Sequence, residues 1–315
     1  MATRLAADVG GTNTRIALFD LEANKFRALK TYINRDYASF QDVIAQWLTG
    51  LEEAAPSQAC IAIAAVPSDD LVSMTNMNWS FSCKALAAEF RFRNFRWIND
   101  FEANAFSLPY LGKADRDVIH TGGGHEQGKL AVIGPGTGLG GATIEPQAQT
   151  WNVCACEPGS TSLAPANALE LELFKVLLQR HSQVYAELLV SGPGLLRLYK
   201  LLGDITDKPG SARTPADVSQ LALGEEEETA VLALKTFSAL LGSIAGDFSL
   251  ATGSYGGLFL AGGIVPTMIP FLRASDFHQR FCDKGAMSAN LGQIPVYAIT
   301  TAQPGLIGAA HAPLN

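Results

Sequence analysis

Three short apolar runs in this chain each end in a glycine-rich turn, and this pattern constrains the fold more than any other feature of the sequence. The runs occupy residues 4–9, 130–133 and 258–261. The first turn passes into a second alternating strand at residues 14–19 rather than into a helix, which excludes a P-loop or a dinucleotide-binding fold there. Because strands also alternate with helical patterns along the rest of the chain, the sequence predicts a mixed α/β fold.

Further strands and helices follow from the spacing of apolar residues. Short apolar or alternating runs predict strands at residues 26–32, 59–65, 95–98 and 142–144. Helical periodicity predicts helices at residues 39–51, 167–179, 195–202 and 225–252. The last helix is expected to open with four glutamates at residues 225–228, where carboxylates face the positive end of the helix dipole. A polar, glycine-rich stretch after residue 109 predicts a domain boundary.

The first turn carries the groups that a phosphate needs. Gly10 and Gly11 allow a bulky anion to approach the backbone, whose N–H groups and the Thr12 hydroxyl can donate to phosphate oxygens. Asp8, just before the turn, can hold a magnesium ion through water. Asn13 completes the turn, but Asn, Gly and Thr are also common in ordinary hairpins. The turn alone therefore leaves phosphate binding open.

The second and third turns are candidates for the rest of a nucleotide. Residues 134–141 include five glycines in eight positions, more than a hairpin needs, and can wrap phosphate oxygens. The third turn would let a purine or ribose lie against bare backbone, although close packing of helix on strand explains it equally well. The candidate residues are Gly134, Gly136, Thr137, Gly138, Gly262 and Gly263.

Asn99 and Asp100 directly follow the strand at residues 95–98, at the head of a predicted helix. Either side chain would make a favourable N-cap, but a cap needs only one of them. Phosphoryl transfer to an alcohol requires a carboxylate within hydrogen-bond reach of the hydroxyl, and an adjacent amide can orient the substrate. The pair therefore indicates a catalytic base, Asp100, with Asn99 beside it.

Taken in order, the motifs resemble those of the bacterial glucokinase family in the hexokinase, actin and Hsp70 ATPase superfamily. They are DVGGTN, TNMNWSF, IND, GPGTGLG, a glutamate in a glycine turn, SGPG and LAGGIVP. The resemblance covers essentially the whole chain. It implies a two-domain, ribonuclease H-like (actin-like ATPase) fold with a sugar cleft between the domains. The small domain would comprise residues 1–109 and a C-terminal helix at 300–315, and the large domain residues 110–299.

The resemblance also implies a reaction, the phosphorylation of glucose at its 6-hydroxyl by ATP and Mg²⁺. Asp100 would be the base, and Asn99, Glu157 and Glu187 would hold sugar hydroxyls. The three glycine turns would hold Mg-ATP. The family resemblance further suggests a homodimer.

The chain departs from the family pattern at one sugar-binding turn. Residues 157–160 read Glu-Pro-Gly-Ser, whereas the family usually has Glu-Gly-Gly-His. Ser160 replaces a sugar-binding histidine, and the loss of one neutral hydrogen bond costs about 0.5–1.5 kcal/mol. No catalytic group is lost, so the kinase prediction stands. The substrate stays open between glucose and another hexose or a hexosamine.

The charge and the cysteine content limit which binding partners and which cellular compartment are expected. The net charge is −7 and no Lys/Arg-rich run occurs, so neither nucleic acid nor an anionic membrane is an expected partner. No signal peptide and no uninterrupted apolar stretch long enough to span a bilayer is recognisable, which predicts a cytoplasmic protein. Five scattered cysteines suggest reduced thiols, and Cys154 and Cys156, with no histidine nearby, make a weak zinc site.

Three other functions compete with a kinase. A sugar-sensing regulator would carry an N-terminal helix-turn-helix, for which a first strand at residue 4 leaves no room. An actin-like or Hsp70-like ATPase would keep the phosphate turns without needing Asn99, Asp100, Glu157 and Glu187. A catalytically dead homologue is disfavoured by the intact Asp100.

Overall fold

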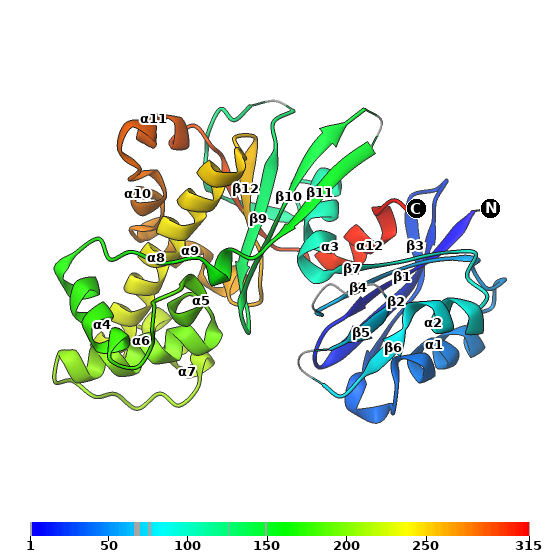
Figure 1. Ribbon diagram of the computed structural model, residues 1–315, viewed down its shortest axis with the longest axis horizontal. Coiled ribbons are helices and arrows are strands. Elements are labelled where there is room, and N and C mark those ends of the chain that lie inside the picture. Colours follow the sequence, from blue (N-terminus) through cyan, green and yellow to red (C-terminus); the bar gives the residue numbers. More distant parts are fainter. Residues whose placement is uncertain (1, 66–69, 75–76, 126, 149, 315) are drawn as a thin grey trace. The chain divides into compact units, whose positions relative to one another are not determined.

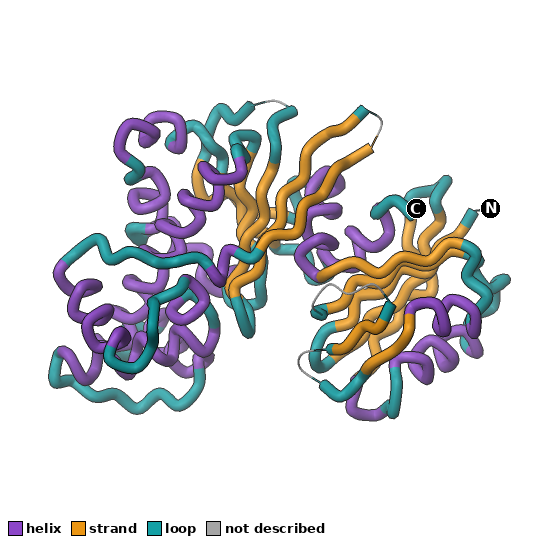
Figure 2. Tube along the Cα trace, viewed as in Figure 1, coloured by secondary structure: helices purple, strands orange, loops and turns teal. Residues whose placement is uncertain are grey.

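The computed structural model describes residues 2–65, 70–74, 77–125, 127–148 and 150–314. The chain forms two compact units, one of residues 1–111, 148–155 and 301–315 and the other of residues 112–147 and 156–300. Both combine helices with strands, which confirms the predicted α/β class (Figures 1 and 2).

The sheet of the first unit has the strand order β3-β2-β1-β4-β7. β1, β2 and β3 form an antiparallel meander, whereas β1, β4 and β7 run parallel. The strands are β1 (Thr3–Val9), β2 (Asn13–Asp20), β3 (Lys25–Ile33), β4 (Gln58–Ile63) and β7 (Asn94–Asn99), with a small hairpin of β5 (Leu71–Ser73) and β6 (Ser80–Ser82).

Helices lie on both faces of this sheet (Figure 2). One face is covered by α1 (Phe40–Thr49) and α2 (Cys83–Glu89), whose apolar side chains join Leu5 and Ile61 in one buried cluster. The other face carries α3 (Asp100–Ser107) and α12 (Pro304–His311), which pack against each other. The buried Arg4 guanidinium of β1 donates to the carbonyls of Ala310 and Ala312, both at 2.7 Å, and so holds the end of α12 on the sheet. Short 3₁₀ turns are η1 (Asn34–Asp36) and η2 (Leu108–Tyr110).

The second large sheet has the order β11-β10-β9-β12-β13-β8, and all of its strands except β11, of which only Cys156 does, belong to the second unit. β9, β12 and β13 are parallel, and antiparallel partners flank them. The strands are β8 (Arg116–His120), β9 (Leu130–Pro135), β10 (Leu139–Gln147), β11 (Thr150–Cys156), β12 (Gly257–Leu260) and β13 (Val296–Ile299).

The longest helix of the second unit, α8 (Glu228–Thr252), lies at the centre of its apolar core, and several other helices pack against it. The helices of this unit besides α8 are α4 (Ala168–Leu178), α5 (Ala186–Leu189), α6 (Gly192–Ile205), α7 (Pro215–Leu223), α9 (Ile269–Ala274), α10 (Phe277–Cys282) and α11 (Ser288–Leu291), with 3₁₀ turns η3 (Pro158–Ser160), η4 (Val265–Met268) and η5 (Gly285–Met287). By length and composition α8 alone among the helices of the described residues is a candidate membrane span, and 83% of its most apolar stretch is buried here, as expected of a core helix.

Three predicted helices have other limits in the structure. α6 occupies Gly192–Ile205 rather than residues 195–202, because Ser191 caps it and a proline stands in its first turn. α8 begins at Glu228, so the glutamates at 225–227 precede it rather than forming its first turn. Glu225 has a positive φ of 55°, and the Glu227 carboxylate accepts a hydrogen bond of 2.5 Å from the Tyr199 hydroxyl, which holds this segment in a loop. The C-terminal helix occupies Pro304–His311 rather than residues 300–315, because Pro304 supplies its first turn and the chain turns extended at Ala312. The predicted strands are all present, with ends shifted by up to three residues.

Candidate active site

The parallel strands of the first unit bring two predicted segments to one edge of the sheet. Val9 pairs with Ile63, and Ile63 in turn pairs with Asn99, so the carboxyl ends of β1, β4 and β7 are in register. The turn at residues 10–13 and the Asn99–Asp100 pair therefore leave the sheet at the same edge. Ligands of α/β proteins commonly bind at such an edge.

The start of α3 separates the roles of Asn99 and Asp100. Asn99 is the N-cap: its Oδ1 accepts from the Phe101 N–H at 2.7 Å, and its own N–H donates to Glu102 Oε2 at 3.0 Å. The Asn99 Nδ2 group donates to the Ala65 carbonyl at 3.4 Å, a long hydrogen bond. Asp100 occupies the first helical position, where its Oδ1 also accepts from Phe101 N–H at 3.0 Å. Since Asn99 and Glu102 form the cap, the helix does not depend on the Asp100 carboxylate for it.

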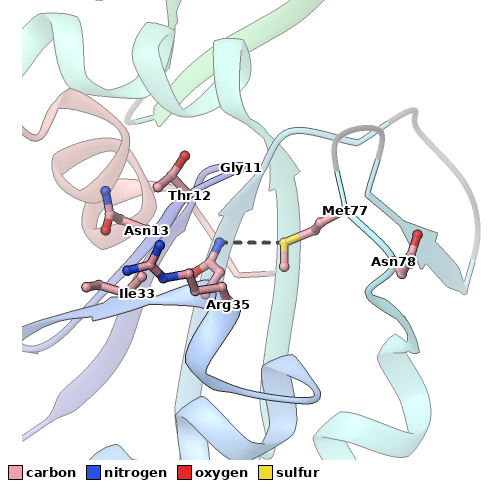
Figure 3. Close-up of a pocket in the computed structure, with 8 residues that line it drawn as sticks. Gly11, Thr12, Asn13, Ile33, Arg35, Met77 and Asn78 are labelled. Atoms are coloured by element: carbon pink, nitrogen blue, oxygen red, sulfur yellow. Dashed lines mark hydrogen bonds between the residues drawn. The ribbon is translucent and has the colours of Figure 1, made fainter.

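The first glycine turn borders a hollow of about 660 Å³ (Figure 3). Gly11 and Thr12 are exposed there, and the turn is closed by a hydrogen bond of 3.0 Å from Gly10 N–H to the Asn13 carbonyl. The lining residues are Gly11, Thr12, Asn13, Ile33, Asn34, Arg35, Met77 and Asn78. The last two belong to the predicted motif at residues 75–81, of which residues 75 and 76 lie outside the described part of the chain.

Asp8 lies near the end of β1 and beside Gly305, a residue that the sequence did not identify as part of the site. Burial raises the pKa of the Asp8 carboxyl above its ordinary value, and the Arg15 guanidinium, 3.6 Å away, opposes part of that rise. Gly305, in the first turn of α12, packs so closely that a Cβ there would be 2.9 Å from the Asp8 Cγ. The only sequence signal for Gly305 is the preceding Pro304, which marks a helix start.

The donor set around Asp8 fits magnesium better than a soft metal. Among the described residues, no three His, Cys, Asp or Glu side chains are grouped so that they could hold an ion, and Cys154 and Cys156 belong to no such group. Mg²⁺ is usually held by one or two carboxylates together with substrate phosphates and water. The desolvated Asp8 carboxylate, next to a glycine turn whose residues Gly11 and Thr12 are exposed, meets that requirement.

In the second unit, the carboxyl end of β9, which includes Gly134, packs against the glycine turn after β12. A Cβ on Gly134 would lie 2.5 Å from the Ala261 carbonyl oxygen, and one on Gly262, whose φ is +98°, would collide with the Pro135 carbonyl. Gly136 and Gly263 differ, because a Cβ at either position would meet nothing within 4 Å. Packing thus explains the first two glycines, whereas the other two have open space in the direction of a Cβ.

The predicted sugar-binding residues of the second unit lie around Glu187 of α5. Glu187 Oε2 accepts from the Leu139 N–H at 2.8 Å, and the same carboxylate lies against Gly138 and Gly159. Within the described residues its Oε1 has no hydrogen-bond partner and can accept from a hydroxyl group. Glu157 and Ser160 are exposed at the ends of the η3 turn, whose Ser160 N–H donates to the Glu157 carbonyl at 3.2 Å.

The motif at residues 191–194 supports the second glycine turn, a role that the sequence did not reveal. The Ser191 hydroxyl caps α6 by accepting from Gly194 N–H at 3.0 Å, and Gly192 N–H donates to the Gly136 carbonyl at 2.8 Å. Serine before a proline-containing helix start is a recognisable cap signal. Its contact with a turn more than fifty residues earlier is a tertiary feature.

Comparison with known proteins gives consistent relatives along the whole chain. A family model described as Glucokinase matches residues 5–315. A glucokinase of Chromobacterium violaceum is 40% identical over 311 residues, covering 98% of this chain and 88% of the relative. The crystal structure of a glucokinase from an Antarctic psychrotroph is 38% identical with a TM-score of 0.90, covering 99% of this chain and 98% of its own. A ROK family glucokinase from Streptomyces griseus, solved with glucose and AMPPNP, shares the fold at 18% identity and a TM-score of 0.65, covering 98% of both chains.

Proposed function

Because the chain belongs to the glucokinase family, we propose that it transfers the γ-phosphate of ATP to the 6-hydroxyl of glucose. The observation that carries this proposal is the Asp100 carboxylate at the head of α3, beside a cap that Asn99 already forms. A coupled ADP-release assay over a panel of hexoses tests it. Glucose should give the highest kcat/KM, and no ADP release above background with any hexose would refute kinase activity.

Asp100 is the proposed general base. Its carboxylate accepts the proton of the sugar 6-hydroxyl as that oxygen attacks the γ-phosphorus, and ADP leaves with the electrons of the broken P–O bond. Asn99, Glu157, Ser160 and Glu187 are the proposed contacts to the other sugar hydroxyls. The unpaired Glu187 Oε1 and the exposure of Glu157 and Ser160 support these roles.

The three glycine turns are the proposed nucleotide site. AMPPNP in the Streptomyces griseus relative supports the use of ATP. The residues proposed to hold Mg-ATP are Asp8, Gly10, Gly11, Thr12, Asn13, Gly134, Gly136, Thr137, Gly138, Gly262 and Gly263. Asp8 would hold magnesium through water, and the ion would neutralise charge on the transferring phosphate.

We further infer that the fold belongs to the hexokinase, actin and Hsp70 ATPase superfamily, with a small and a large domain that match the two compact units except at residues 110, 111, 148–155 and 300. Residues 1–109 with the C-terminal helix are the proposed small domain, and residues 110–299 the proposed large domain. A cytoplasmic, homodimeric enzyme of glycolysis that binds neither nucleic acid nor membrane is the corresponding cellular proposal. It is supported by the family and by the acidic net charge.

One observation favours a second substrate class, another hexose or a hexosamine. Ser160 is exposed and carries a side chain shorter than the imidazole usual at this position, which leaves more room beside the sugar ring. The same hexose panel decides between the two classes. A hexosamine or another hexose with a higher kcat/KM than glucose would replace glucose as the substrate.

A further inference from the structure

Asn34, the first residue of η1, directs its polar groups at the first glycine turn. Although polar, it is only 1% exposed. Its Nδ2 group donates to the Gly10 carbonyl at 2.7 Å, and its backbone N–H donates to the Thr12 carbonyl at 2.9 Å. Its Oδ1 accepts from the Thr14 hydroxyl at 2.7 Å. One buried residue directly after β3 is therefore bonded to the first residue of the turn, to a residue within it and to the residue that follows it.

A further contact links Asn34 to Met77, which also lines the hollow. Its Nδ2 group lies 3.5 Å from the sulfur of Met77, the interaction drawn as the dashed line in Figure 3. The amide thus has no polar group left to rotate toward solvent. Hydrogen bonds with Gly10, Thr14 and Met77 therefore fix the orientation of the amide.

These contacts determine which way the donors of the turn point. In a trans peptide the C=O and the following N–H lie in one plane and point in opposite directions. Because Asn34 holds the carbonyls of Gly10 and Thr12, the N–H groups of Gly11 and Asn13 are turned away from it. Carbonyl oxygens that would repel an anion are thereby occupied, and the donors on the other side of the turn are aligned before any anion binds.

We propose that Asn34 is a positioning residue for the nucleotide, a role that rests on the proposed binding of ATP phosphates by the Gly10–Asn13 turn. A turn with two adjacent glycines samples many backbone conformations when it is unrestrained. Asn34 selects the conformation that presents donors to the phosphates, so ATP binds without first having to order the turn. Asn34 itself does not touch the reacting atoms.

The first test compares Asn34→Ala with Asn34→Asp. The aspartate is almost the same size and keeps an acceptor for Thr14, but it replaces the Nδ2 donor with an oxygen that faces the Gly10 carbonyl. Both variants should raise the Kd for AMPPNP, measured calorimetrically with Mg²⁺, by about tenfold, the scale of one or two hydrogen bonds. The KM for ATP should rise in parallel, whereas the KM for glucose at saturating ATP should stay within about twofold.

Trp47→Phe is the matched control for loss of stability. Trp47 is buried in the same unit and donates to the Ala28 carbonyl at 2.9 Å, without contact to the turn. The Trp47→Phe substitution should lower Tm while leaving the Kd for AMPPNP unchanged. If Asn34→Ala behaves like Trp47→Phe, or if Asn34→Asp binds AMPPNP like the wild type, Asn34 is a structural residue and the proposal is overturned.

A third variant distinguishes failure of the inference from failure of the proposed function. Gly11→Val adds a branched side chain at an exposed position of the turn, where a phosphate would have to approach the backbone. If it leaves the Kd for AMPPNP unchanged, the turn does not hold the nucleotide and the proposed site fails together with the inference. If it weakens AMPPNP while Asn34→Ala does not, only the inference fails. Should the Asn34 variants not fold, Thr14→Val removes one partner of the amide and should weaken AMPPNP by about threefold; unchanged affinity then overturns the proposal.

Discussion

Replacement of Asp100 by asparagine separates the chemical role of this residue from its role in the helix. The change substitutes one carboxylate oxygen by an amide nitrogen and keeps the size and shape of the side chain. The N-cap of α3 is made by Asn99 and Glu102, through hydrogen bonds of 2.7 and 3.0 Å that the substitution leaves in place. The helix loses only one negative charge at its positive end, which is worth about 0.3–1 kcal/mol. We therefore expect Tm to fall by no more than about 4 °C.

The expected kinetic effect is much larger than the effect on stability. Removal of a general base typically lowers a rate by about 10²–10⁴, and the amide cannot accept the proton of the 6-hydroxyl. The variant should therefore show a kcat at least about a hundredfold below that of the wild type. Because the asparagine still forms hydrogen bonds of similar geometry, the Kd for glucose should stay within a few-fold.

Coupled ADP release, glucose binding and thermal unfolding, measured on the same preparations, test this expectation. Asn99→Ala is the contrasting variant, since loss of an N-cap costs about 0.5–2 kcal/mol and should lower Tm more than Asp100→Asn does. Turnover of Asp100→Asn close to that of the wild type would refute the assignment of the base. A loss of turnover accompanied by an equal loss of folded protein would instead make Asp100 a structural residue.

Three further changes test other parts of the structure. Gly305→Ala should place a Cβ 2.9–3.2 Å from the Asp8 carboxylate and displace it, which should lower kcat at saturating glucose. If kcat and its dependence on Mg²⁺ are both unchanged, the position of the Asp8 carboxylate does not matter for the reaction. Ser160→His should lower the KM for glucose by up to about tenfold with kcat nearly unchanged, because position 160 is exposed and the change adds one contact; a higher KM would indicate a pocket adapted to serine. Glu170→Ala should cost about 3–5 kcal/mol in urea unfolding, because the largely buried Arg280 guanidinium loses the carboxylate whose oxygens lie 2.6 and 3.1 Å away and keeps a neutral partner, the Ser243 hydroxyl; a midpoint close to wild type would contradict this.

Local patterns in the sequence were sufficient for eight of the thirteen strands in the described residues and for the position of the Asn99–Asp100 pair, whereas β5, β6, β8, β11 and β13 were not predicted. Alternation and apolar runs are properties of neighbouring residues, and the end of β7 follows from them. The same reasoning placed the start of α8 three residues too early, because acidic residues favour a helix start but the hydrogen bond from Tyr199 holds Glu227 in the preceding loop. A contact between distant segments overrode a local preference.

Residues that support the candidate site from a distance could not be predicted in this way. Asn34 follows a different strand from the turn that it holds, and Gly305 comes from the far end of the chain to lie against Asp8. Neither residue type by itself indicates a functional role, since an asparagine after a strand and a glycine in the first turn of a helix both occur without one. Their roles depend on the pairing of β2 with β3 and on the docking of α12, which only the tertiary structure provides.

The glycine motifs themselves combine two physical causes that the sequence cannot separate. Gly134 and Gly262 are glycine because the backbone of the neighbouring strand leaves no space for a Cβ, so any side chain there would disturb the packing of β9 on β12. Gly136 and Gly263 have that space and no protein atom within it, so packing within the described residues gives no reason for a glycine. A phosphate or a ribose that approaches the backbone does give one. Substitution of Gly134 or Gly262 is therefore a test of the fold, whereas substitution of Gly136 or Gly263 is a test of nucleotide binding.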